Sequence, residues 1–209
     1  SNGTAVLGLG YIGALASKPV MEGKSALFKK FAGVDSIDIC IDEEDPEKFI
    51  DIVKKISISF GAINLEDIKA PECFEIEQRL DTEVDIPIMH DDQHGTAIIS
   101  TAGLINACKL LDKKFEDLKV VIRGAGAAAI SCGKMYKSLG ITNIFMIDRN
   151  GVIVSSRDGL NTQKQEFARD GEYSIDDVFK DADVFLGLSS PDRKSTRLNS
   201  SHRCISYAV

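Results

Sequence analysis

The sequence predicts an α/β protein with a mostly parallel β-sheet and helices on both of its faces. Three observations support this fold class. Short apolar runs typical of buried strands alternate along the chain with segments of helical periodicity. No repeat of fixed period interrupts this alternation. The 209 residues are 44% hydrophobic and 27% charged, which is ordinary for a globular protein and excludes a largely disordered chain.

In the first half of the chain, the spacing of apolar residues predicts the individual elements. Phe49, Val53 and Ile56 recur at helical spacing, and Pro71 suits the first turn of another helix. In chain order, we expect a strand-like run at 5–9, a helix that includes 24–31, a strand at 37–41, a helix at 46–56, a strand at 62–65, a helix at 71–80 and a strand at 86–89.

In the second half, residues 96–111 are apolar almost all round, which predicts a buried helix. We then expect a strand at 119–122, a helix at 127–139, a strand at 143–147, a short helix at 174–179 and a strand at 184–188. The character of the sequence changes around 96–111, so we place one domain over 1–95 and a second over 96–190. Nothing periodic organises the basic residues 191–209, and we expect them to be a disordered, non-native tail.

Charge and composition exclude several classes of protein. The net charge of −7 argues against a nucleic-acid-binding protein and against docking on anionic lipid. No run of about eighteen apolar residues predicts a membrane-spanning helix. The five cysteines show neither CxxC nor CxxH spacing, which favours reduced thiols and a cytoplasmic protein over a disulfide framework or a zinc site.

A glycine-rich turn follows the expected strand at 119–122 and opens the next helix. Gly124, Gly126 and Ala129 form the GxGxxA pattern of a dinucleotide-binding turn, and the next strand ends at Asp148, where a carboxylate can bind the ribose hydroxyls. A tight turn without a ligand is the alternative. The segment 8–13 also reads GxGxxG, but no strand ending in an acid follows it, so we interpret it as a backbone turn.

Lys24 precedes Leu27, Phe28 and Phe31 by three, four and seven residues, which places it on the apolar face of a helix. A lysine drawn toward a core is costly unless it is paired, and its pKa tends to fall toward the range of a proton carrier. A lysine whose ammonium reaches solvent at the start of a helix is the alternative.

Two strands end in adjacent acids. The strand at 62–65 is followed by Glu66 and Asp67, and the strand at 86–89 runs through His90 into Asp91 and Asp92. Open α/β sheets bind ligands at the carboxyl ends of their strands. Oxygen ligands suit Mg²⁺ or Mn²⁺, so the matched pairs favour a metal site over two solvated turns.

These features together resemble the malic enzyme family, particularly its bacterial-type branch. The resemblance rests on the segments at 5–10, 18–24, 63–67, 90–97 and 124–129, in this order. It implies the C-terminal part of the malic enzyme N-terminal domain followed by the first half of a Rossmann-type domain. The implied reaction is the oxidative decarboxylation of L-malate to pyruvate and CO₂ with NAD or NADP and Mg²⁺ or Mn²⁺, in a homodimer or higher homo-oligomer.

The resemblance also assigns roles to residues of this sequence. It implies catalytic roles for Lys24 and Asp91, and it implies the metal ligands Glu66, Asp67 and Asp92. It implies cofactor binding by Gly124, Gly126, Ala129 and Asp148. Arg149 beside Asp148 could meet a 2′-phosphate, so NADP stays open beside NAD.

The family's proton-donating tyrosine has no counterpart among the tyrosines of this chain. We therefore expect a fragment that is truncated at both ends and inactive alone. Two alternatives remain at this point. One is another metal- and NAD-dependent decarboxylating dehydrogenase of 2-hydroxy acids, and the other is a non-catalytic dinucleotide-binding or oligomerisation module.

Overall fold

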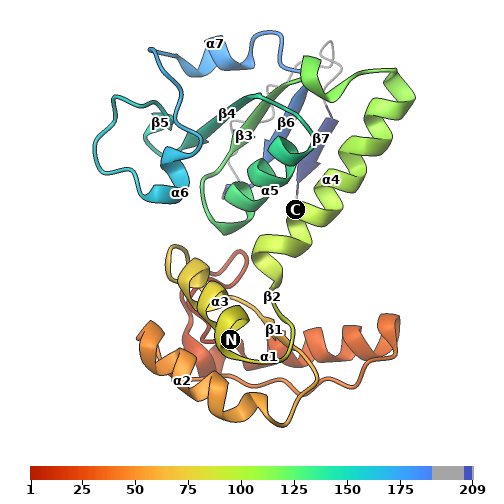
Figure 1. The fold of residues 1–209 in the computed structure, drawn as a ribbon, viewed down its shortest axis with the longest axis vertical. Coiled ribbons are helices and arrows are strands. Elements are labelled where there is room, and N and C mark those ends of the chain that lie inside the picture. The colour runs from red at the N-terminus through yellow and green to blue at the C-terminus, as the bar shows by residue number, and fades with distance from the viewer. Residues whose placement is uncertain (190–204, 209) are drawn as a thin grey trace. The chain divides into compact units, whose positions relative to one another are not determined.

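The computed structural model describes residues 1–189 and the backbone of 205–208. The chain divides into two compact units, Ser1–Asp92 and Gln93–Val209 (Figure 1). The predicted α/β fold class is confirmed, since both units contain parallel strands together with helices. Among the described residues, no helix is both long enough and apolar enough to cross a membrane.

The first unit is mostly helical and contains a pair of parallel strands. Its β1 and β2 pair with Leu65 opposite His90, so both strands end at the same edge. The elements of this unit are α1 (Gly13–Leu27), the π-helix η1 (Phe28–Ala32), α2 (Pro46–Ser57), β1 (Ile63–Leu65), α3 (Glu72–Glu83) and β2 (Ile88–His90).

Capping and burial explain the helix α2. The side chain of Asp45 accepts hydrogen bonds from the N–H groups of Glu47 and Lys48, and Pro46 occupies the first turn. Phe49 and the two apolar residues Ile50 and Val53 are buried on one face of the helix. In α3, Cys73, Ile76 and Leu80 are buried in the same way.

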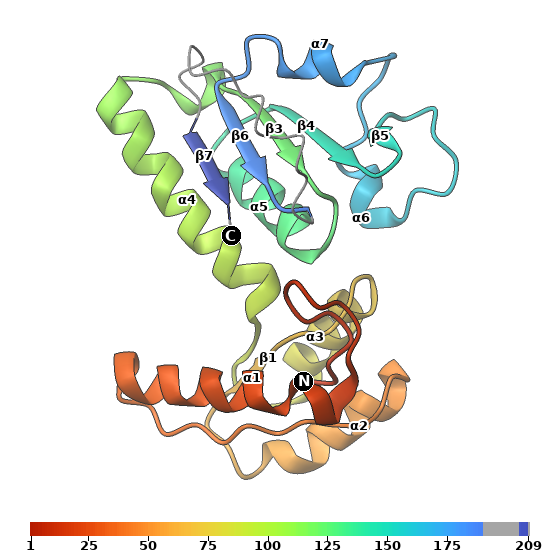
Figure 2. The ribbon, with the colours of Figure 1, turned by 180° about the vertical axis from the view of Figure 1, so that it is seen from behind.

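The second unit is built on a five-stranded sheet in the order β5-β4-β3-β6-β7 (Figure 2). The central strand β3 pairs in parallel with β4 and β6, whereas β5 is antiparallel to β4. The elements here are α4 (Asp91–Leu111), which begins at the last two residues of the first unit, the 3₁₀-helix η2 (Phe115–Asp117), β3 (Lys119–Arg123), α5 (Ala127–Ser138), β4 (Asn143–Asp148), β5 (Gly151–Val152), α6 (Thr162–Gln165), α7 (Ile175–Phe179), β6 (Val184–Gly187) and β7 (Ile205–Ala208).

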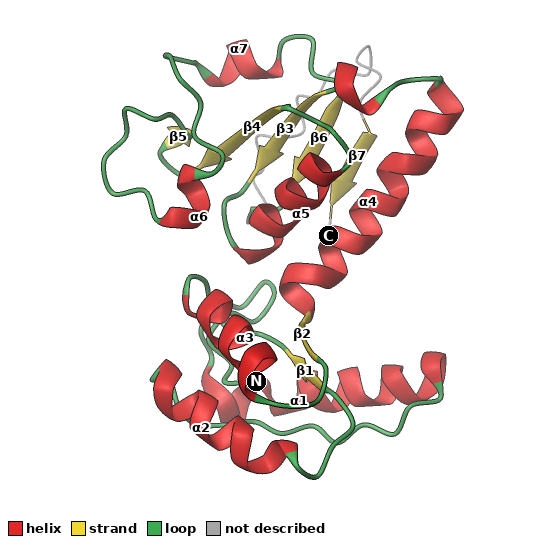
Figure 3. Cartoon of the chain, viewed as in Figure 1, coloured by secondary structure: helices red, strands yellow, loops and turns green. Residues whose placement is uncertain are grey.

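Helices cover both faces of this sheet (Figure 3). Val178 of α7 packs against Val121, Phe145 and Phe185 on one face. Met146, whose side chain alternates with Phe145 across the sheet, faces α5 on the other. The sheet is therefore buried on both faces, which explains why its strands are continuous apolar runs in the sequence.

Two strands that we expected in the first unit are not strands. The run at 5–9 turns back on itself, because Gly8 and Gly10 take positive φ values of 75° and 71°, and only Val6 and Gly10 form a bridge. The segment 37–41 forms no strand in the described part of the chain. Its backbone hydrogen-bonds to that of Ser1, which donates to the carbonyl of Ile39 and accepts from the N–H of Ile41.

The tail also differs in part from the expectation. Ile205–Ala208 form β7 and pair in parallel with β6, so the prediction of disorder is wrong for these four residues. Without that partner, β6 would present an unpaired edge, and backbone pairing does not require an apolar pattern in the sequence. The residues 190–204 and 209 lie outside the described part of the chain, and the non-native origin of the tail stays a prediction.

The buried face of α3 gives a stability prediction. Leu80 is fully buried, so we expect Leu80→Ala to lower the free energy of unfolding by about 2–5 kcal/mol. The control Ile58→Ala removes a side chain that is 89% exposed and should change it by less than about 0.5 kcal/mol. Urea unfolding followed by circular dichroism measures both, and equal midpoints would contradict the packing of α3.

Candidate active site

The parallel pairing of β1 with β2 brings two pairs of acids to one edge of the first unit. Glu66 and Asp67 follow β1 directly, and Asp91 and Asp92 follow β2 as the first turn of α4. Acidic side chains are favoured in the first turn of a helix, where the N–H groups are unpaired. The matched strand ends thus place four carboxylates together, as the sequence predicts.

Three of these carboxylates converge on one point. Glu66, Asp67 and Asp92 each offer an oxygen, and these atoms all lie within 4.8 Å of one another. Backbone contacts fix the arrangement. Asp67 takes a positive φ of 55°, its N–H donates to Asp92 Oδ2 over 2.8 Å, and its carbonyl accepts from the N–H groups of Thr4 and Ala5.

The electrostatics of this carboxylate cluster, Glu66–Asp67–Asp92, suit a cation. Burial, together with the charge of Glu66, raises the pKa of Asp67 to about 6 and that of Asp92 to about 7. Asp67 Oδ2 is buried and has no hydrogen-bond partner among the described residues. A set of hard oxygen donors with one unsatisfied buried atom fits Mg²⁺ or Mn²⁺.

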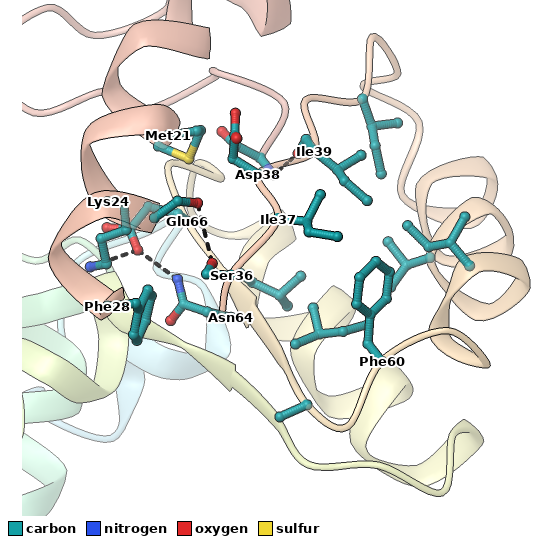
Figure 4. A pocket seen from close by; sticks show the side chains of 18 of the residues that line it. Met21, Lys24, Phe28, Ser36, Ile37, Asp38, Ile39, Phe60, Asn64 and Glu66 are labelled. Atoms are coloured by element: carbon teal, nitrogen blue, oxygen red, sulfur yellow. Dashed lines mark hydrogen bonds and ion pairs between the residues drawn. The ribbon is translucent and has the colours of Figure 1, made fainter. Parts of the chain in front are cut away.

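Lys24 on α1 points toward Glu66 of the carboxylate cluster (Figure 4). Its Nζ lies 2.6 Å from Asp91 Oδ2 and 3.0 Å from Glu66 Oε2, and 5.9 Å from the centre of the Phe28 ring. Burial lowers the pKa of Lys24, but the hydrogen bonds to Asp91 and Glu66 outweigh it, so the pKa is raised. The expectation of a lowered pKa is wrong, because the helical pattern could not show how closely two carboxylates approach.

A cavity of about 230 Å³ adjoins Lys24 and Glu66. Figure 4 shows Lys24, Glu66 and Asn64 grouped together, with apolar side chains such as Phe60 farther along the wall. Asn64 Nδ2 donates to Glu66 Oε2 over 2.8 Å. Sequence reasoning missed Asn64, although its position two residues before Glu66 on a strand could have identified it as a neighbour on the same face.

The glycine-rich turn lies in the second unit, between β3 and α5. Gly124 has a φ of +128°, and a Cβ there would meet the Leu188 backbone at 2.9 Å, so the close approach of the chain after β6 requires glycine. Within the described residues, a Cβ on Gly126, the N-cap of α5, would meet no atom within 4 Å, and no side chain caps this helix start. Ala129 is buried. Open space before uncapped N–H groups fits the pyrophosphate of a dinucleotide.

Asp148 ends β4, the strand next to β3, but its carboxylate is already engaged. Arg157 Nη2 lies 3.0 Å and Lys164 Nζ 2.9 Å from Asp148 Oδ2. Burial raises the pKa of Asp148, but these hydrogen bonds outweigh it and lower the pKa to about 2. Arg157 and Lys164 lie in segments without a periodic pattern, so the sequence offered no signal for them.

Comparisons with known proteins agree with this architecture. The family model described as the malic enzyme N-terminal domain matches residues 1–81, and that of the malic enzyme NAD binding domain matches residues 93–186. The chain is 55% identical to the NAD-dependent malic enzyme of Geobacillus stearothermophilus and 55% identical to the NADP-dependent malic enzyme of Escherichia coli K12, each over 91% of this chain.

A solved structure shows the same likeness. The NAD-dependent malic enzyme of Thermotoga maritima superimposes with a TM-score of 0.86 at 44% identity and covers 90% of this chain. The chain spans 41% and 26% of the two curated relatives and 52% of the Thermotoga chain. The resemblance inferred from the sequence is therefore confirmed, and the second unit carries an NAD-binding domain.

The ion pairs of Asp148 predict a pH-dependent contribution to stability. Because the pKa of Asp148 lies near 2, below its ordinary 3.8, Asp148→Asn should destabilise the protein by about 1 kcal/mol at neutral pH. A lowered pKa stabilises the fold above the unfolded-state value, and this contribution is lost as the pH falls from about 4 towards 2. The difference in Tm between wild type and variant should shrink over that range.

Thermal unfolding followed by circular dichroism tests this prediction. Asp158→Asn is the matched control, since Asp158 is an exposed acid of the same segment and should leave Tm unchanged at every pH. A difference between wild type and Asp148→Asn that stays constant from neutral pH to pH 2 would show that the ion pairs do not stabilise the fold.

Proposed function

This chain belongs to the malic enzyme family, and we propose that it supplies the metal-binding and proton-transferring residues for the oxidative decarboxylation of L-malate. The products are pyruvate, CO₂ and NADH or NADPH. The convergence of Glu66, Asp67 and Asp92 within 4.8 Å, with Lys24 beside them, carries the proposal. A non-catalytic dinucleotide-binding module would not require these side chains to meet.

Glu66, Asp67 and Asp92 would hold Mg²⁺ or Mn²⁺. A divalent cation bound there supplies Lewis-acid polarisation of the malate hydroxyl and of the keto group formed from it. The chain's own contribution is orientation. The N–H of Asp67 holds the Asp92 carboxylate, and the bonds from Thr4 and Ala5 hold Asp67 in the backbone conformation that makes this contact.

We assign the exchange of the hydroxyl proton to Lys24 Nζ. This atom lies 3.0 Å from Glu66 Oε2, so it reaches the region that the carboxylate cluster surrounds. Asp91 Oδ2 lies 2.6 Å from Nζ, which makes Asp91 the next acceptor for a proton and the group that holds the ammonium in place.

For the cofactor, NAD or NADP supplies the hydride acceptor when bound. Gly126 and the uncapped start of α5 would meet the pyrophosphate, and the buried Ala129 lets α5 pack closely behind it. Asp148 stays a proposal for the ribose, since its carboxylate is shared with Arg157 and Lys164. We also propose that the cofactor is NAD or NADP, that the domains span 1–95 and 96–190, and that the full-length protein is a homodimer or higher homo-oligomer.

The metal site predicts a binding measurement on the 209-residue chain itself. Asp67→Asn removes one charge from the carboxylate cluster while keeping the size of the side chain, and should weaken Mn²⁺ binding at least about tenfold. Electron paramagnetic resonance of free Mn²⁺ gives the dissociation constant without malate or nucleotide. The control Asp81→Asn, on the exposed side of α3, should bind as wild type does. Equal affinities for wild type and Asp67→Asn would refute the metal site.

The role of Lys24 predicts a loss of rate without a loss of metal. In a polypeptide of the relatives' length that contains this chain, Lys24→Met should lower kcat for malate by about 100-fold or more and leave Mn²⁺ affinity no weaker. Lys29→Met is the control, because Lys29 pairs with the exposed Asp35 and not with a residue of the carboxylate cluster. If the kcat of Lys24→Met is within a few-fold of the wild-type value, Lys24 does not transfer the hydroxyl proton.

A further inference from the structure

The three carboxylates of the proposed metal site are not held in the same way. Asp92 Oδ2 accepts from the backbone N–H of Asp67, and Asp67 is fixed through its own backbone. The Glu66 carboxylate has no backbone donor among the described residues. Its contacts come from two side chains, Lys24 and Asn64.

Lys24 alone is a poor anchor for Glu66. Its ammonium is shared, and it lies closer to Asp91, at 2.6 Å, than to Glu66, at 3.0 Å. The lysine side chain also has four rotatable bonds on a helix of its own, so it can follow Asp91 without Glu66. Something else must select the orientation of the Glu66 carboxylate.

Asn64 has the rigidity that Lys24 lacks. It is the middle residue of β1, where it pairs with Met89 of β2, so its backbone is fixed. Because side chains alternate along a strand, Asn64 and Glu66 leave β1 on the same face. The amide Nδ2 reaches Glu66 Oε2 over 2.8 Å, a charge-assisted hydrogen bond to the oxygen that also faces Lys24 (Figure 4).

Strand formation does not explain an asparagine at this position. Asparagine is depleted in strands, where β-branched and aromatic residues are favoured. The neighbour Ile63 follows that preference and Asn64 does not. The side chain therefore serves its contact with Glu66 and not the stability of the strand.

We propose that Asn64 is a positioning residue that holds the Glu66 carboxylate in the orientation that binds the divalent cation. The inference rests on the proposed function, because it assumes that Glu66 is a metal ligand. Partners that orient a metal ligand commonly change metal affinity by 10- to 100-fold. A neutral amide can do this without cancelling the charge that the cation needs.

Two substitutions separate positioning from strand stability. Asn64→Leu keeps the approximate shape of the side chain but lacks the donor, and a strand accepts leucine at least as well as asparagine. Asn64→Gln keeps an amide donor on a side chain one carbon longer. Ile63→Val is the matched control, because it trims the neighbouring strand residue without touching a hydrogen bond of Glu66.

The measurement is Mn²⁺ binding to the 209-residue chain by electron paramagnetic resonance, with Tm recorded for each variant. We expect Asn64→Leu to raise the dissociation constant about tenfold or more with no fall in Tm. Asn64→Gln should recover most of that loss, and Ile63→Val should bind within about twofold of wild type. A purely structural role predicts the opposite, a fall in Tm that accompanies any loss of affinity.

The outcomes also separate this inference from the proposed function. If the wild type and Asn64→Leu bind Mn²⁺ equally well, the role of Asn64 is wrong and the metal site still stands. The role of Asn64 is also wrong if Asn64→Gln binds Mn²⁺ no more tightly than Asn64→Leu, or if a fall in Tm accompanies the loss of affinity. Wild type that binds Mn²⁺ no better than Asp67→Asn overturns the metal site and this inference with it.

Discussion

Mutual repulsion among Glu66, Asp67 and Asp92 is the constraint around which the first unit is arranged. Three ionised carboxylates with oxygens within 4.8 Å of one another repel, so the backbone must hold them together against this repulsion. The parallel pairing of β1 with β2 does so, because both strands end at one edge and each is followed directly by acids. The left-handed backbone of Asp67 then turns its N–H toward Asp92 and its carbonyl toward the start of the chain.

The second unit uses strand ends in another way. There the end of β3 meets the start of α5, and the feature that it presents is a set of backbone N–H groups instead of carboxylates. Gly124 is required by the chain after β6, which passes within 2.9 Å of where a Cβ would be, whereas open space adjoins Gly126. Glycine is thus favoured at the two positions of one motif for different physical reasons, and only Gly126 points to a ligand.

Local patterns in the sequence predicted most of the fold, and long-range contacts account for the errors. The helix expected at 46–56 is Pro46–Ser57 and the strand expected at 143–147 is Asn143–Asp148, because burial periodicity and caps are local. Three features were not predicted: the pairing of β7 with β6, the raised pKa of Lys24 and the ion pairs of Asp148. Each depends on contacts between segments that are far apart in the sequence or have no periodic pattern. Adjacent acids after two strands predicted the carboxylate cluster. The two-residue spacing on β1 could have indicated Asn64 as a neighbour of Glu66, but no spacing rule could reveal that the N–H of Asp67 orients Asp92.

The hydrogen-bond donors around the proposed cation site differ from those around Asp148. Asp148 is met by two cationic side chains, Arg157 and Lys164, so its charge is cancelled within the protein. Around the carboxylate cluster most donors are neutral: the N–H of Asp67 and the amide of Asn64 orient carboxylates without cancelling their charge.

With Asp91 included, four carboxylates carry a formal charge of −4 when all are ionised, and the ammonium groups of Lys24 and of the Ser1 N-terminus offset only two of these charges. Neutral donors preserve this negative charge, and burial makes it costly to leave unbalanced, as the raised pKa values of Asp67 and Asp92 show. A bound divalent cation would balance the negative charge and so offset the cost of burying it.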